Sequence, residues 1–166
     1  MPDILVRPFD IAIDLQKAID LRLEALKSDQ RAFRRSLEEE SSRTLDQWKD
    51  RFRPTEENMF ILALRGEEAI GMIGAKQRPG ELGAWSLNSV YVRKEYREQH
   101  IASRLFGVIE NAIKQRGGKR FKFQVNSDQQ PAVAFYERMG CKQSGSERDS
   151  QGDGVEYTKL IMEKNL

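Results

Sequence analysis

The chain has 166 residues, a length that favours one domain with a single core, and we expect residues 1–166 to form that domain. Its 28 Lys and Arg residues nearly balance 26 Asp and Glu residues, and a net charge of +2 argues against a strongly basic nucleic-acid binder. One cysteine, Cys141, and one histidine, His100, exclude an internal disulfide framework and a multi-histidine metal site, so we expect no metal.

No apolar run approaches the roughly 20 residues that a membrane span requires. The first residues, Met1-Pro2-Asp3, lack the basic-then-apolar pattern of a secretory signal. We therefore expect a soluble, cytoplasmic protein with no membrane partner.

The first half of the chain predicts a strand, two amphipathic helices and a β-hairpin, from the spacing of its apolar residues and from its turn signals. These elements are expected over residues 4–7, 11–28, 45–52, 59–64 and 69–75. The charged stretch 29–43 between the two helices is interpreted as a solvated helix or loop. The alternative for this stretch is a mobile segment that shapes a substrate cleft.

The second half predicts alternating strands and helices followed by two closing strands around a Gly-rich turn at 151–154. They are expected over residues 85–92, 101–116, 121–125, 131–139, 141–146 and 155–162. Alternation along residues 85–92 predicts that Trp85, Leu87, Ser89 and Tyr91 share one face of that strand. Strands mixed with helical crossovers predict an α/β or α+β domain with a mixed sheet.

The stretch from Val90 to Leu105 is the most informative, because a strand leads through a loop into the helix with the clearest apolar face. The start of that helix has no Ser, Thr, Asp or Asn that could cap its N–H groups. Basic residues, among them Arg93, Lys94 and Arg97, surround it. An uncapped helix start among cations suits a pyrophosphate, although many strand–loop–helix units with surface arginines bind nothing.

The hexapeptide Arg97-Glu98-Gln99-His100-Ile101-Ala102 resembles the Arg/Gln-x-x-Gly-x-Gly/Ala core of the acetyl-CoA-binding motif of the GNAT superfamily of N-acetyltransferases. Residues 126–141 are similar to the family's Asn-x-x-Ala-x-x-Phe-Tyr-x-x-x-Gly-Phe segment, and residues 4–8 resemble its first strand. The resemblance covers nearly the whole chain. It implies a mixed, largely antiparallel sheet of six to seven strands with about four helices and splayed central parallel strands.

The resemblance also implies acetyl-CoA as the co-substrate. Backbone groups of Val90 and Val92 would contact its pantetheine arm, lying as a pseudo-strand beside them. The phenol of Tyr136 would be the catalytic acid that protonates the leaving thiolate, although an aromatic residue at a helix position can also be core. The residues that the resemblance assigns to the cofactor are Val90, Tyr91, Val92, Arg97, Glu98, Gln99, His100, Ile101, Ala102, Ser103, Asn126, Gln129 and Tyr136.

The sequence departs from the family pattern at three cofactor positions. His100 and Glu98 stand where glycine is common, and a side chain there must turn outward to let phosphate approach the backbone. Glu98 also adds a negative charge, which weakens binding unless it points to solvent or is paired. Gln129 replaces a common asparagine with a longer amide.

The sequence does not assign a residue to the role of general base. Many GNAT proteins have a glutamate where this chain has Ser86, with Asn88 on the same face, and neither side chain takes a proton from an ammonium at neutral pH. A water chain or Glu81 could do so, although Glu81 is better interpreted as a solvated loop carboxylate. Cys141 is expected to be a small buried residue rather than a nucleophile.

The leading hypothesis is an acetyltransferase that moves an acetyl group from acetyl-CoA to a primary amine by direct attack in a ternary complex. The acceptor would be a small-molecule amine or a protein amino group, and the strand N–H near Val92 would polarise the thioester carbonyl. A non-catalytic acyl-CoA-binding or interaction module is the alternative. A nucleic-acid-binding domain is a third hypothesis, disfavoured by the net charge, and we expect no nucleic-acid partner. The resemblance also allows a homodimer.

Overall fold

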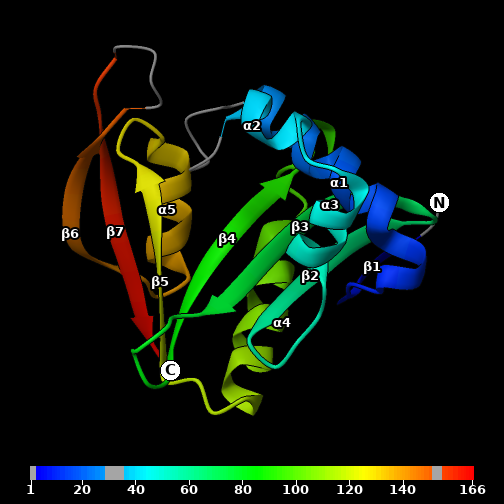
Figure 1. The fold of residues 1–166 in the computed structure, drawn as a ribbon. Helices are drawn as coiled ribbons and strands as arrows, with labels where there is room; N and C mark the ends of the chain where they lie inside the picture. Colours follow the sequence, from blue (N-terminus) through cyan, green and yellow to red (C-terminus); the bar gives the residue numbers. More distant parts are fainter. Residues whose placement is uncertain (1–2, 29–35, 151–154) are drawn as a thin grey trace.

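The computed structural model describes residues 3–28, 36–150 and 155–166 and is built on one seven-stranded sheet (Figure 1). The strand order is β1-β2-β3-β4-β5-β7-β6, and every neighbouring pair is antiparallel except β4 and β5. The strands are β1 (Ile4–Pro8), β2 (Asn58–Arg65), β3 (Glu68–Gln77), β4 (Ala84–Val92), β5 (Arg120–Asn126), β6 (Lys142–Asp149) and β7 (Tyr157–Asn165).

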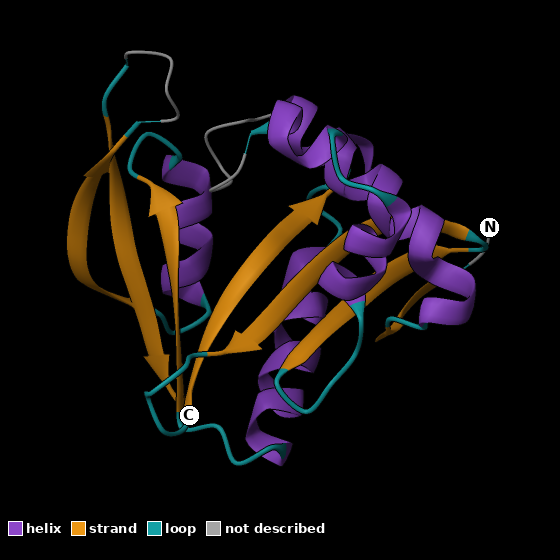
Figure 2. Cartoon of the chain, viewed as in Figure 1, coloured by secondary structure: helices purple, strands orange, loops and turns teal. Residues whose placement is uncertain are grey.

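Helices cover both faces of the sheet (Figure 2). They are α1 (Ile11–Ser28), α2 (Leu37–Ser41), α3 (Leu45–Phe52), α4 (Ile101–Gln115) and α5 (Gln130–Arg138). The first three lie on one face of the β1–β4 half, and α4 and α5 lie on the other face. The expected mixed, largely antiparallel sheet is confirmed, with one helix more than expected because α2 forms inside the charged stretch 29–43. Residues 29–35 of that stretch and the expected turn 151–154 lie outside the described residues.

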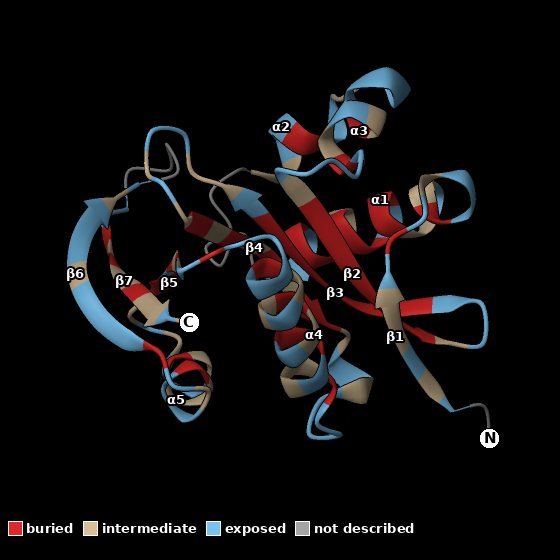
Figure 3. Cartoon of the chain, turned by 90° about the horizontal axis from the view of Figure 1, so that it is seen from below, coloured by how far each residue is buried: buried red, intermediate tan, exposed pale blue. Residues whose placement is uncertain are grey.

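Two apolar clusters stabilise the fold, one on each side of the sheet, and β2 and β3 between them are largely buried (Figure 3). On one side, Leu105, Phe106 and Ile109 of α4 are fully buried against the sheet. On the other side, Leu21 and Leu26 of α1 are equally buried. This two-sided burial explains why β2 and β3 are apolar runs without clear alternation.

The central parallel strands β4 and β5 pair only at their beginnings, where residues 84–86 of β4 face residues 120–122 of β5. Beyond this point each strand pairs only with its outer neighbour, so the sheet opens toward the carboxyl ends of both strands (Figure 1). The expected splay of the central parallel strands is therefore confirmed.

Strand β4 contains a β-bulge that the sequence did not predict. Met72 of β3 pairs with Tyr91 and Gly74 pairs with Asn88, so two residues of β4 face a single residue of β3. The first of these two, Ser89, has a φ of 55°, in the left-handed region that glycine normally occupies in such bulges.

The bulge changes which side chains share a face. Trp85 and Leu87 pack on the α4 side, and after the bulge Val90 and Val92 also pack on that side. Tyr91 packs on the α1 side. The predicted face shared by Trp85, Leu87, Ser89 and Tyr91 is therefore wrong, because one extra residue shifts the alternation by one position.

Candidate active site

A cleft of about 840 Å³ lies where β4 and β5 separate. Its walls come from the end of β4, the loop before α4, the first turn of α4 and one face of α5. Among the expected cofactor residues, it is lined by Val90, Tyr91, Val92, Arg97, Glu98, His100, Ile101, Ala102, Ser103, Gln129 and Tyr136. Gln99 and Asn126 do not belong to the lining.

Sequence reasoning missed several apolar residues of the cleft wall. Pro131, Ala132 and Phe135 of α5 and Met139, directly after this helix, line the cleft together with Tyr136, and Ala25 of α1 lines it as well. The spacing that identified an apolar helix face does not tell whether that face meets another element or an open cleft.

The backbone of β4 presents N–H groups to the cleft. The N–H of Arg93 donates to the carbonyl of Ile70 on β3, at 2.8 Å. Because N–H groups alternate along a strand, those of Val92 and Val90 point away from β3 and toward the opening. The carbonyl of Val92 accepts a hydrogen bond from Nε of Arg97 at 2.9 Å, so this side chain folds back over the end of β4.

The loop before α4 adopts the backbone conformation of a glycine-containing loop without the glycines. Glu98 has a φ of 68° and His100 a φ of 59°, both in the left-handed region, and both side chains are exposed. His100 is the residue before α4 and makes no side-chain capping bond. The first N–H groups of α4, from Ile101 to Ser103, therefore remain available for an anion.

Tyr136 lies in an aromatic cluster on the wall of the cleft, and 8% of it is exposed. Its ring centroid is 4.4 Å from that of Phe123 and 5.4 Å from that of Phe135. Burial raises the pKa of the Tyr136 phenol well above its ordinary value, and the nearby Cys141 adds to the shift. The phenol is therefore protonated at neutral pH and can donate a proton. Cys141 is buried as expected, and burial raises its pKa to about 11.

The structure places Glu81 away from the cleft. It lines a separate hollow at the β3–β4 connection, and its carboxylate contacts Arg78 at 2.9 Å and Arg120 at 3.5 Å. The hydrogen bond from Arg78 lowers the pKa of Glu81 most strongly, which makes it a weaker base. Ser86 accepts a hydrogen bond from Arg78 at 3.0 Å.

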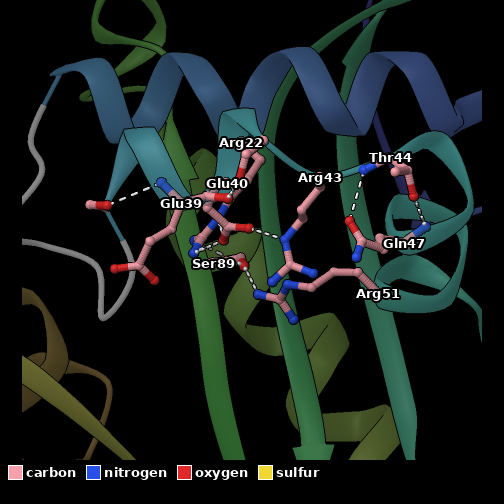
Figure 4. Close-up of polar contacts among 10 residues, drawn as sticks. Arg22, Glu39, Glu40, Arg43, Thr44, Gln47, Arg51 and Ser89 are labelled. Carbon is pink, nitrogen blue, oxygen red and sulfur yellow. Dashed lines mark hydrogen bonds and ion pairs between the residues drawn. The ribbon is translucent and has the colours of Figure 1, made fainter.

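A group of buried charges behind the bulge was also missed. Glu40 of α2 is fully buried, and its carboxylate contacts Arg22 at 2.9 Å and also Arg43 (Figure 4). Arg22 and Arg51 both donate to the hydroxyl of Ser89, at 3.3 and 3.4 Å. The solvated-face interpretation of the charged stretch is wrong for Glu40, and nothing in the run of three glutamates distinguishes it from its exposed neighbours.

Comparison with known proteins identifies the family to which this fold and this loop belong. A model of the Acetyltransferase (GNAT) family matches residues 23–141, which include α4, β4, β5, α5 and the whole cleft loop. The chain belongs to the GNAT family of acetyltransferases. The resemblance inferred from the two motifs is confirmed, and membership implies acetyl transfer from acetyl-CoA as the activity.

Solved structures share the fold at low sequence identity. A GNAT-family acetyltransferase from Streptococcus pneumoniae is 17% identical, with a TM-score of 0.78 and coverage of 99% of this chain and 100% of that one. Aminoglycoside 6'-acetyltransferase type Ii is 22% identical, with a TM-score of 0.75 and coverage of 97% and 96%. A ribosomal-protein-alanine N-acetyltransferase from Brucella melitensis is 20% identical, with a TM-score of 0.76 and coverage of 98% and 99%.

The named activities of these GNAT proteins differ in acceptor, because one is named for a small molecule and another for a protein. At these identities the likeness concerns the fold alone. In the described part of the chain, no helix combines the length and apolar character needed to cross a membrane.

Proposed function

We propose that the protein transfers the acetyl group of acetyl-CoA to a primary amine by direct attack in a ternary complex. The observation that carries this proposal is the convergence of three features on one cleft: the N–H groups of Val90 and Val92, the uncapped start of α4, and the protonated phenol of Tyr136. Each feature supplies a different part of the chemistry.

The start of α4 would bind the pyrophosphate through backbone N–H groups, with the positive end of the helix dipole favouring the negative charge. The N–H groups of Val90 and Val92 would hold the pantetheine arm beside β4, with that of Val92 polarising the thioester carbonyl. Tyr136 would donate its proton to the leaving thiolate. A phenol is neutral at pH 7 and so has a proton to give, and the burial of Tyr136 keeps it in that form.

No dedicated base is assigned. Among the described residues that line the cleft, Glu98 is the only carboxylate, and it belongs to the loop assigned to the pyrophosphate. We therefore propose that water accepts the proton of the acceptor ammonium. The acceptor is a small-molecule or protein amine, and turnover on a panel of amines identifies which of the two it is.

The experiment that tests this function is calorimetric titration with acetyl-CoA, followed by an amine panel in which CoA release is measured. Wild type should bind acetyl-CoA in the micromolar range. Arg97→Ala should bind more weakly, because it removes the guanidinium that holds the Val92 carbonyl and lies over the ring of Tyr91. Arg148→Ala is the matched control, since Arg148 is an exposed arginine on β6.

The second candidate function is a non-catalytic acyl-CoA-binding module. The side chains at positions 98 and 100 and the missing base favour it. Binding of acetyl-CoA without turnover on any amine would select this candidate. The absence of binding to acetyl-CoA and longer acyl-CoAs would overturn both.

A further inference from the structure

The bulge residue Ser89 is held by side chains from α1 and α3, the two longer helices that cover this face of the sheet. Its hydroxyl accepts from Arg22 of α1 at 3.3 Å and from Arg51 of α3 at 3.4 Å (Figure 4). Both Arg22 and Ser89 are almost completely buried, at 4% exposed each. A serine hydroxyl with two guanidinium donors in a buried place is a specific arrangement rather than a surface contact.

Arg22 is itself fixed by Glu40 of α2. The Nη2 and Nε atoms of Arg22 lie 2.9 and 3.1 Å from the same carboxylate oxygen, and Arg43 contacts the other oxygen. Glu40 is fully buried, so its charge requires these partners. The carboxylate therefore holds the guanidinium in the position from which it reaches Ser89.

Ser89 has a φ of 55°, a conformation in which the Cβ atom of an L-residue clashes with the backbone. A non-glycine residue persists there only when its surroundings hold it. The two hydrogen bonds to its hydroxyl provide that restraint. Without the bulge, the alternation along β4 would continue and Val90 and Val92 would face α1 instead of α4.

We infer that Arg22, Glu40 and Arg51 are positioning residues, which hold Ser89 in the left-handed conformation and so direct the N–H groups of Val90 and Val92 into the cleft. The inference rests on the proposed function, since those N–H groups are assigned there to the pantetheine arm and the thioester carbonyl. It adds that the group of buried charges acts on the reaction through the backbone of β4. None of the three side chains lines the cleft.

The first test compares Ser89→Ala with Ser89→Gly. Both variants lack the hydroxyl, but only glycine adopts a φ of 55° without a steric cost. We expect kcat of Ser89→Ala to fall about tenfold, with a smaller change in KM, as the strained conformation loses its restraint. Ser89→Gly should restore kcat to within about twofold of wild type, because the bulge forms without help.

Two outcomes of this comparison would overturn the inference. If Ser89→Ala turns over like wild type, the restraint is not needed. If both variants lose kcat equally, the hydroxyl itself acts and not the backbone conformation. A structural readout that does not need turnover accompanies the kinetics: the ¹⁵N–¹H resonances of Val90 and Val92 should shift in Ser89→Ala and much less in Ser89→Gly.

The second test separates positioning from stability. Glu40→Gln and Asp14→Asn each neutralise a fully buried carboxylate that pairs with an arginine, but Asp14 pairs with Arg7 of β1, away from the bulge. Both should lower Tm. Only Glu40→Gln should also lower kcat at a temperature where both variants are folded, and an equal loss of kcat in the two would overturn the inference.

Failure of the inference differs visibly from failure of the proposed function. If wild type does not bind acetyl-CoA, the proposed function fails, while the resonances of Val90 and Val92 still report whether Ser89 controls the strand. If wild type binds and turns over but the variants at positions 89 and 40 behave like wild type, only the inference fails.

Discussion

At the scale of single residues, the buried phenol of Tyr136 determines the pH dependence that we expect. Because its pKa is raised above the ordinary value of about 10, the acid form persists up to at least pH 10. We predict that kcat shows no descending limb between pH 7 and pH 10. Tyr136→Phe should lower kcat about a hundredfold at every pH in that range, with the Kd for acetyl-CoA unchanged.

The measurement is a pH profile of kcat for wild type and Tyr136→Phe with one acceptor amine, beside calorimetric Kd values. A descending limb below pH 10 that is present in wild type and missing in Tyr136→Phe would contradict the raised pKa, and a Tyr136→Phe variant with the kcat of wild type would contradict the assignment. So would a variant that binds acetyl-CoA much more weakly, since the role proposed for the hydroxyl is proton donation.

A second prediction at this scale concerns the carboxylate of Glu98 and its effect on acetyl-CoA binding. It is exposed, lines the cleft, and lies in the loop assigned to the pyrophosphate. Glu98→Gln should tighten acetyl-CoA binding about two- to fivefold at low ionic strength, and the gain should largely disappear at high salt, because exposed charges are screened. Calorimetry at two salt concentrations measures this.

Glu95→Gln is the matched control for Glu98→Gln. Glu95 is an exposed glutamate three positions earlier, in the short 3-10 helix Lys94–Tyr96, and does not line the cleft. The substitution Glu95→Gln should leave the Kd for acetyl-CoA nearly unchanged. Equal effects of the two substitutions would mean that net charge, rather than the place of Glu98, controls binding.

How far the sequence determines the site also differs from residue to residue. The motifs predict that Arg97 and Tyr136 belong to one site, and both residues line the same cleft, because a motif specifies both the order of elements and the positions on them. Ser89 was assigned to the wrong face, because nothing local in residues 84–92 signals an extra residue. Its left-handed conformation is stabilised by Arg22 and Arg51, far away in the sequence, and such long-range support leaves no local pattern.

At the scale of elements, we expect the substitution of glycine by alanine to have opposite effects on stability at two positions. Gly107 lies on the exposed side of α4, and a Cβ there meets nothing within 4 Å. Gly107→Ala should therefore stabilise the protein by about 0.5–1 kcal/mol, through helix propensity. Gly74 lies in β3 opposite Asn88, next to the bulge, and a Cβ there would lie 2.5 Å from side-chain atoms of both Asn88 and Phe60.

Gly74→Ala should accordingly destabilise the protein by roughly 1–3 kcal/mol, because the side chains of Asn88 and Phe60 must move to make room for the Cβ atom. Urea unfolding of wild type and both variants measures the change in the free energy of unfolding that each substitution causes. A destabilised Gly107→Ala would show that α4 is more crowded than its contacts indicate. A neutral Gly74→Ala would show that the side chain of Phe60 or Asn88 yields easily.

The elements themselves followed from apolar periodicity where they were long. Helix α1 and helix α4 were predicted almost to the residue, because each has several turns of apolar spacing. Helix α2 was not predicted as such, because it has five residues and a largely charged sequence. It begins where the hydroxyl of Ser36 accepts a hydrogen bond from the N–H of Glu39, and it is held by the ion pairs of Glu40 with Arg22 and Arg43, which only the folded chain provides.

At the scale of the whole molecule, the opening of the sheet is a consequence of topology. Strands β4 and β5 are parallel and connected through α4, whereas each pairs antiparallel with its outer neighbour. Packing of α4 on one half and α5 on the other half of the sheet keeps the two strands apart beyond residue 86. The cleft is thus built into the connection of the strands, which is why a family motif predicts it and composition does not.

Two buried carboxylates set the stability of the whole molecule in acid. The pKa of Asp14 is lowered: burial alone would raise it, but the hydrogen bonds from Arg7 and from the N–H of Asp10 outweigh burial. The pKa of Glu40 is lowered in the same way, because the charges of Arg22 and Arg43 outweigh its burial. Each group therefore binds its proton less readily in the folded than in the unfolded chain.

The sign of the pH effect follows from these lowered pKa values. The stabilisation by both carboxylates is complete above the unfolded-state values of about 4 and is lost as pH falls through the folded-state values. We predict that the free energy of unfolding is nearly constant from pH 6 to pH 8 and decreases by roughly 1–3 kcal/mol toward pH 3. The double variant Asp14→Asn, Glu40→Gln should be less stable than wild type at pH 7 but should lose less on acidification.

Urea unfolding at pH 7 and pH 3 measures both quantities, with Glu56→Gln as control because the Glu56 side chain is 95% exposed. The control should follow the wild-type curve at both pH values. Parallel losses of stability in wild type and the double variant would mean that other carboxylates cause the acid sensitivity. The convergence of the two curves in acid would instead locate that sensitivity at the two ion pairs that attach α1 to β1 and α2 to α1.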